Sequence, residues 1–182
     1  MRLTPENLLS VFYALRGISA WDDARFIAEH MLEGTSHGSD RYARNLGAIA
    51  RRCLADCLYN DPGEGKSDLA TAERLYAEAL DISRALAREL DTPEARRDVS
   101  VSLNYVDHVA HVRGDLATAE RLCAEDLDIS RALARELDTP EARRDVSVSL
   151  HNVADMARAR GDLATAGLLY TEGLEFLRAL AR

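Results

Sequence analysis

A repeat of 47 residues constrains this chain more than any other feature. The letters DLATA begin at Asp68, Asp115 and Asp162, so each copy follows the previous one by 47 residues. The segment 68–103 returns at 115–150 with two substitutions in 36 positions, Tyr76 to Cys123 and Ala79 to Asp126. Repeats of this length are units that bury their apolar faces only by stacking on neighbours. We therefore expect a stack of repeated units, an architecture that usually presents a binding surface.

Each repeat has the pattern of two helices. Apolar residues keep a helical period over 116–137, and Thr139 followed by proline predicts a new helix that runs to about Arg160, before Gly161. The chain contains only 4 proline residues, and its hydrophobic content of 47% supports a packed core. No segment alternates apolar and polar residues as a half-buried strand does. The expected fold is all-α, an α-solenoid of about four stacked helical hairpins.

The period also predicts the organisation of the chain as a single helical domain over 1–182. Thr4, Pro5 and Glu6 begin a first hairpin that shares the logic of the repeats but not their letters. The expected parts are a divergent N-terminal hairpin over 1–40, a first hairpin over 41–90 with an inserted loop at 60–67, a second repeat over 93–137 and a third over 140–182.

Composition narrows the classes of partner. The net charge of −8 and the pI near 5.1 argue against nucleic acid or an anionic membrane as the main partner, because phosphate binding needs a dense basic surface. No apolar run approaches the roughly 18 residues of a membrane span, and the first residues lack the apolar core of a signal peptide. We expect a cytoplasmic protein with three reduced cysteines.

The letters of the repeat resemble a known family. The pattern Ala72-x-x-x-Tyr76-x-x-Ala79-Leu80, and Gly114-Asp115-Leu116-x-x-Ala119 after Leu103-x-x-Val106-x-x-x-Ala110, is similar to the tetratricopeptide repeat. The long unit resembles the variety found in kinesin light chains and many bacterial proteins. Asp126 and Gly173 depart from the pattern, because they replace the small residue Ala79. The resemblance implies a right-handed solenoid and a non-catalytic adaptor or scaffold that binds a protein or peptide in a concave groove.

The positions that differ between the copies indicate which residues of such a groove would determine what it binds. Segments 104–114 and 151–161 differ at 7 of 11 positions, although the flanking 36 positions are almost identical. Positions 104, 108 and 111 share one helical face. In the resembled family this face lines the groove. The groove residues implied by the resemblance are Val101, Asn104, His108, His111, Val148, His151, Asp155 and Arg158. Drift after a recent duplication is the alternative explanation.

The last helix is more apolar than its counterpart one repeat earlier. Arg121, Ile129 and Ser130 are replaced by Leu168, Phe176 and Leu177. A helix that is apolar around more of its circumference is expected to be buried. We therefore expect self-association, such as a homodimer, through Leu168, Phe176 and Leu177. A self-assembling structural protein is thus the alternative function, and a regulatory or small-ligand sensor that acts with a separate effector is a weaker one.

The sequence does not indicate an enzyme or a cofactor. The letters NDPGEGKS at 60–67 approach a phosphate-binding loop, but a predicted helix precedes them where that loop needs a strand. His108, His111, His151 and Asp155 could converge on a metal ion, yet nothing in the sequence fixes their geometry, and no metal site is predicted. Cys53 and Cys57 are interpreted as small core residues.

Overall fold

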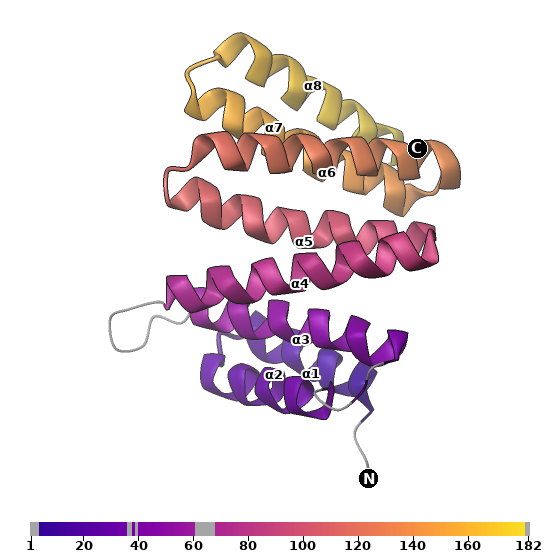
Figure 1. Cartoon of the computed structure of the whole chain (residues 1–182). Coiled ribbons are helices and arrows are strands. Elements are labelled where there is room, and N and C mark those ends of the chain that lie inside the picture. The colour runs from indigo at the N-terminus through magenta and orange to yellow at the C-terminus, as the bar shows by residue number, and fades with distance from the viewer. Residues whose placement is uncertain (1–3, 36–37, 39, 61–67, 181–182) are drawn as a thin grey trace. The chain divides into compact units, whose positions relative to one another are not determined.

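The computed structural model describes residues 4–35, 38, 40–60 and 68–180. Within these residues the chain forms eight helices and no strand, so the predicted all-α fold of helical hairpins is confirmed. The chain divides between Leu90 and Asp91 into two compact units. The helices, labelled as in Figure 1, are α1 (Pro5–Gly17), α2 (Trp21–Thr35), α3 (Arg41–Asn60), α4 (Leu69–Leu90), α5 (Pro93–Val112), α6 (Leu116–Leu137), α7 (Pro140–Ala159) and α8 (Leu163–Leu180).

The first unit contains α1 to α4, in which consecutive helices pack on one another. Its core includes Phe12 of α1, Ala24 and Ala28 of α2, and Cys53 and Cys57 of α3. The interpretation of both cysteines as core residues is confirmed, and burial raises the pKa of the Cys53 thiol to about 12. The expected inserted loop lies at 60–67, of which residues 61–67 fall outside the described part of the chain.

The second unit contains α5 to α8, and here too each helix packs on the next (Figure 1). One buried cluster joins Ala110 of α5 and Ala119 of α6 to Met156 of α7. A second cluster joins Leu127 of α6 to Leu150 of α7 and to neighbouring apolar residues of α8. The interior of this unit is therefore continuous from one hairpin to the next.

The helices of this unit begin and end where the sequence signals predict. Thr139 accepts a hydrogen bond from the backbone N–H of Ala142 at 3.2 Å, and Pro140 occupies the first helical position, where its missing N–H costs nothing. Thr92 caps α5 in the same way. Asp138 ends α6 in the left-handed conformation, with φ at 49°, and its N–H donates to the carbonyl of Ala134. One hairpin thus passes to the next within two residues.

An unusual polar cluster lies inside the α5–α6 hairpin. Asp107 and Asp126 are both buried, and the Cys123 thiol donates to Asp107 Oδ2 at 2.8 Å. Ser100 donates to Asp126 Oδ1, while Asp126 Oδ2 is buried without a hydrogen-bond partner among the described residues. Both substitutions that distinguish the near-identical segments, Cys123 and Asp126, belong to this cluster. Burial raises the pKa of Asp107 to about 7 and also raises the pKa of Asp126.

Candidate functional site

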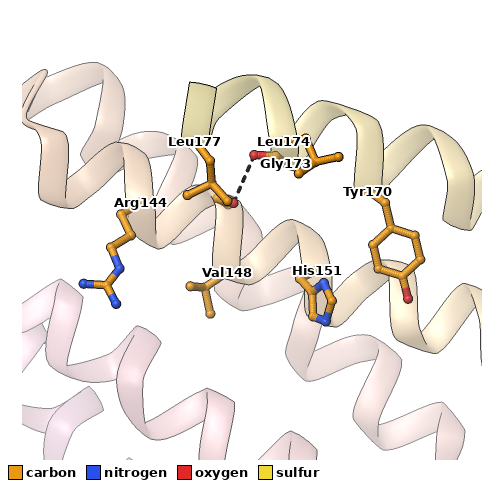
Figure 2. Close-up of a pocket in the computed structure, with 8 residues that line it drawn as sticks. Arg144, Val148, His151, Tyr170, Gly173, Leu174 and Leu177 are labelled. Carbon is orange, nitrogen blue, oxygen red and sulfur yellow. Dashed lines mark hydrogen bonds between the residues drawn. The ribbon is translucent and has the colours of Figure 1, made fainter. Parts of the chain in front are cut away.

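The candidate site is a cleft between α7 and α8. Its volume is about 510 Å³, and its apolar wall comes from Val148 of α7 and from Leu174 and Leu177 of α8 (Figure 2). We call this surface the α7–α8 cleft. Its lining residues are Arg144, Ser147, Val148, His151, Tyr170, Gly173, Leu174 and Leu177. Because the wall is mostly apolar, the surface suits an apolar side of a ligand more than a strongly polar molecule.

The two helices approach closely at the floor of the cleft. Gly173 is buried against α7, and its carbonyl accepts a hydrogen bond from Ser147 Oγ at 3.0 Å (Figure 2). A Cβ atom at position 173 would lie 3.5 Å from the carbonyl oxygen of Ser147, which is ordinary van der Waals contact. A methyl group would therefore also fit here, and the hydrogen bond from Ser147 joins α8 to α7 beneath the side chains that line the cleft.

Polar groups lie at the two ends of this row (Figure 2). The Arg144 guanidinium lies at one end, and the rings of His151 and Tyr170 lie at the other, with centroids 5.2 Å apart. Tyr170 donates to Asp155 Oδ1 at 2.5 Å, and Arg158 donates to the same oxygen at 3.0 Å. These groups give a ligand an orientation, because the two ends of the cleft differ in charge and hydrogen-bonding capacity.

The carboxylate that anchors this end is held in its charged form. Burial acts to raise the pKa of Asp155, but hydrogen bonds from Tyr170 and Arg158 and the nearby His151 outweigh it and lower that pKa. The same hydrogen bond raises the pKa of Tyr170. An ionised Asp155 therefore fixes the Tyr170 ring beside His151.

The α5–α6 hairpin, one repeat earlier, shows which structural element packs on a surface like the α7–α8 cleft. The positions 47 residues earlier lie on α5 and α6, and we call them the α5–α6 counterpart. They are Arg97, Ser100, Val101, Asn104, Cys123, Asp126, Leu127 and Ser130. Helix α7 lies against this surface, since it packs on α6 and its polar side chains reach α5. The counterpart of the cleft is therefore occupied by an amphipathic helix.

The contacts of α7 with α5 are polar. Arg97 of α5 donates to both carboxylate oxygens of Asp145, at 2.6 and 3.2 Å. Two turns further along, Asn152 donates to Asn104 Oδ1 at 2.7 Å. These two contacts set the register of α7 along α5.

The contacts of α7 with α6 are mainly apolar. Leu127 belongs to one buried cluster with Val146 and Leu150. A polar pair lies within this interface, in which Ser149 donates to Ser130 Oγ at 3.0 Å. Because both hydroxyls are buried and paired, the interface carries little unsatisfied polarity here.

The α7–α8 cleft and the α5–α6 counterpart differ in how much of their side chains is exposed to solvent. Leu127 is 7% exposed, whereas Leu174 at the same position of the next repeat is 50% exposed. Ser130 is 1% exposed, and Leu177 at its position is 44% exposed. The α7–α8 cleft is therefore an uncovered copy of a surface that receives a helix one repeat earlier, and the two positions compared here, Leu174 and Leu177, are apolar.

The structure places the predicted groove residues in different surroundings. Val148 and His151 line the cleft, and Asp155 and Arg158 form the hydrogen-bonded group at its polar end. Asn104 bonds α7 instead. The remaining groove residues, none of which lines this cleft, are Val101, His108 and His111 on α5. Partial desolvation and the neighbouring imidazole of His111 lower the pKa of His108.

The residues predicted for self-association do not share one surface. Leu177 lines the α7–α8 cleft. Leu168 is 73% exposed and is not among the lining residues. Phe176 is partly buried against the cluster that contains Leu127 and Leu150, so it stabilises the hairpin from inside.

Sequence reasoning missed several lining residues, namely Arg144, Ser147, Tyr170, Gly173 and Leu174. Comparing copies draws attention to positions that change, but Arg144 and Leu174 are identical to Arg97 and Leu127. What differs is the presence of a covering helix. The available signal was the 47-residue offset itself, applied to residues that contact the next helix.

No geometry for metal binding or membrane insertion appears in the part of the chain that the structure describes. Among those residues, no group of three or more His, Cys, Asp or Glu side chains is arranged to hold a metal ion. His151 instead lies 3.4 Å from Asp155 and beside Tyr170. None of the described helices combines the length and the apolar character that a membrane span requires.

Comparisons with known proteins place the fold. No protein-family model matches the chain, and no curated protein matches it significantly. The solved structure described as a DHF58 filament has a TM-score of 0.52 and 18% identity, with 98% of this chain and 86% of that chain covered. The de novo designed helical repeat protein DHR64 gives a TM-score of 0.48 and 19% identity over the same shares. The chain is therefore a helical repeat protein whose fold is similar to that of the chain in the DHF58 filament.

Proposed function

We propose that this protein is a non-catalytic binding module, an adaptor or scaffold, whose α7–α8 cleft receives an amphipathic helix from a protein partner. One observation carries the proposal: a helix, α7, covers Leu127 and Ser130, whereas Leu174 and Leu177, the same positions one repeat later, are exposed. Leu174 and Leu177 would lose their exposed apolar area on binding, which supplies the driving force. This is the helix-in-groove mode of recognition, read through apolar anchors at helical spacing.

The bound helix is defined by the chemistry of the cleft. It needs small or apolar residues spaced by three and four, so that they face Leu174, Leu177 and Val148. A hydroxyl opposite Leu177 would be unfavourable, because Leu177 replaces the serine that pairs with Ser149 in the counterpart. A carboxylate near the start of the helix would face Arg144, as Asp145 faces Arg97.

We also propose that the repeats are of the tetratricopeptide type. Ala110 and Ala119 support this proposal, because they meet in one buried cluster where the resemblance implies a close approach of the two helices. Within such an array, the working surface proposed here involves only the α7–α8 hairpin, with Val148, His151 and Leu177 as the residues that sequence reasoning and geometry share.

A direct test uses a labelled peptide of the α7 sequence, residues 139–160, with alanine in place of Ser149. Fluorescence anisotropy should show saturable binding to the full chain. Leu177→Glu should weaken it by at least about tenfold, because burying a leucine contributes about 2 kcal/mol and a buried charge is unfavourable. Leu163→Glu is the matched control, since Leu163 is an exposed leucine of the same helix outside the cleft. Equal affinity for both variants would contradict the proposal.

A further inference from the structure

A second apolar surface in the chain matches the helix that the cleft requires. Val11 and Ile18 of the α1 region are 39% and 75% exposed, and Ala14 between them is exposed as well. The spacing of three residues places Val11 and Ala14 on one side of α1, and Ile18, four residues further on, is the C-cap residue that follows its last turn. The opposite side of α1 is used for folding, since Phe12 is 1% exposed in the core of the first unit.

Helix α1 begins as α7 does. Both start with Thr-Pro-Glu, and Thr4 accepts from the backbone N–H of Asn7 as Thr139 accepts from that of Ala142. The two threonines therefore define a common register. Counted from them, the exposed residues correspond as follows: Val11 to Val146, Ala14 to Ser149 and Ile18 to Val153.

In α7 these three positions face α6, together with Leu150 and Met156. Val146 packs with Leu127, and Val153 packs against the cluster that contains Cys123. The sides of α1 and α7 that pack within their own unit also correspond. Phe12 takes the position of Ser147, whose hydroxyl donates to a carbonyl of α8. Helix α1 thus carries on its outer side the apolar pattern that α7 uses on the α5–α6 counterpart, whereas Ser10 stands at the position of Asp145.

One difference between the two helices matches a difference between the two surfaces. In the counterpart, Ser149 donates to Ser130. In the cleft, Leu177 replaces Ser130, and in α1, Ala14 replaces Ser149. The hydroxyl pair Ser149–Ser130 is therefore replaced by the apolar pair Ala14–Leu177, with one change on the helix and one on the surface. Had only one side changed, a hydroxyl would be buried without a partner.

We infer that the helix bound in the α7–α8 cleft is α1 of a second copy of this chain, with Ala14 opposite Leu177 and Ile18 opposite Tyr170. This inference rests on the proposed function and names its partner. The contact is heterologous: it uses the first unit of one copy and the second unit of the other. A pair of copies joined by one such contact keeps one unused α1 surface and one unused cleft, which are available to further copies.

Sedimentation velocity with two complementary variants tests this arrangement. The mass of the wild-type chain should grow with concentration past that of a dimer. Ile18→Glu should remove the α1 surface and Leu177→Glu the cleft, so each variant alone should sediment as a monomer. An equimolar mixture should form a dimer and nothing larger, because only one intact surface of each kind remains. Leu163→Glu should assemble as the wild type does.

Several outcomes overturn the inference. A monomeric wild type from micromolar to millimolar concentration does so, and if the α7 peptide still binds, the proposed function stands with a different partner. A dimer lost in Leu177→Glu but kept in Ile18→Glu shows an α8-to-α8 contact instead. Loss of association in Leu168→Glu, but not in Ile18→Glu or Leu177→Glu, shows that another side of α8 makes the contact between copies.

Folding of the variants is checked separately. Ile18 and Leu177 are exposed, so both variants should keep the helical circular dichroism of the wild type. If Ile18→Glu fails to fold, Ala14→Arg tests the same surface, because arginine is a good helix former and its side chain would clash with Leu177. Assembly of a folded Ala14→Arg chain like that of the wild type would contradict the inference.

Discussion

The α5–α6 and α7–α8 hairpins share most of their sequence but have different surroundings. In the first, Leu127 and Ser130 are covered by α7, and the interior holds the buried Asp107 and Asp126. In the second, Leu174 and Leu177 are open, and Gly173 takes the place of Asp126. The comparison teaches that one surface can be an interior in one repeat and a binding surface in the next, depending on whether a helix lies against it.

The sharpest test of this comparison is a matched pair of truncations. Leu127→Ala should lower the free energy of unfolding by about 2–4 kcal/mol, because it leaves a cavity in a packed interior. Leu174→Ala, 47 residues later, should change it by less than about 0.5 kcal/mol in the monomer, because half of its side chain is already in solvent. Urea denaturation followed by circular dichroism measures both. Equal losses would show that the cleft is covered in solution.

The buried carboxyls should give the second unit a pH-dependent stability. Burial raises the pKa of Asp107 to about 7, so the folded state holds this proton more tightly than the unfolded state. Its stabilising contribution is therefore complete below about pH 4 and is lost as the pH rises through about 7. We expect a decrease of roughly 2 kcal/mol in the free energy of unfolding between about pH 5 and pH 8.

Asp107→Asn should remove most of this decrease, because its amide does not titrate, and Ala154 at the same position of α7 shows that the position needs no carboxyl. The relevant measurement is the difference between wild type and variant across the pH range, which cancels groups common to both. A parallel pair of stability curves would mean that Asp107 does not titrate in this window.

Helix caps should not distinguish the two hairpins. Thr92→Ala and Thr139→Ala each remove one hydrogen bond to a first-turn N–H, at 3.3 and 3.2 Å, and each should cost about 1 kcal/mol. Thermal unfolding of both variants provides the check. Equal losses would confine the difference between the hairpins to the residues of the cleft, whereas a much larger loss for either threonine would extend it to the helix starts.

The smallest effect concerns the arginine at the edge of each surface. Arg97→Met should lower stability by about 0.2–1 kcal/mol, because an exposed ion pair with Asp145 is lost. Arg144→Met, its counterpart in the open cleft, should be neutral within about 0.5 kcal/mol. Chemical denaturation at low and high salt measures both, and only the Arg97 effect should decrease with salt.

The fold was predictable from the sequence because its signals are local. Proline after a capping threonine, a helical apolar period and a fixed offset of 47 residues specify where each helix begins and which element follows. The helices over 93–137 and 140–180 therefore agree with expectation to within a few residues at their ends.

The candidate site was only partly predictable, since it depends on which surfaces are covered. Val148, His151 and Leu177 were identified from substitutions and from the resemblance. Leu174 was not, because its letter is the same as that of Leu127 and only its neighbours differ. The role of Asn104 in bonding Asn152 likewise depends on the packing of α7 against α5, which no local pattern specifies.

The turn from Asp138 through Thr139 to Pro140 has a consequence for how such chains change length. All the geometry of the junction is contained in these few residues: a left-handed terminus, a side-chain cap and a ring that pre-sets the next φ. A further copy of the α5–α6 hairpin inserted at this junction would offer α7 the same partners as the present one, at the positions of Arg97, Asn104 and Ser130. Chains of this kind can thus gain whole repeats while the hairpin that carries the cleft stays unchanged. The length of the array and the partner that it binds can therefore evolve independently.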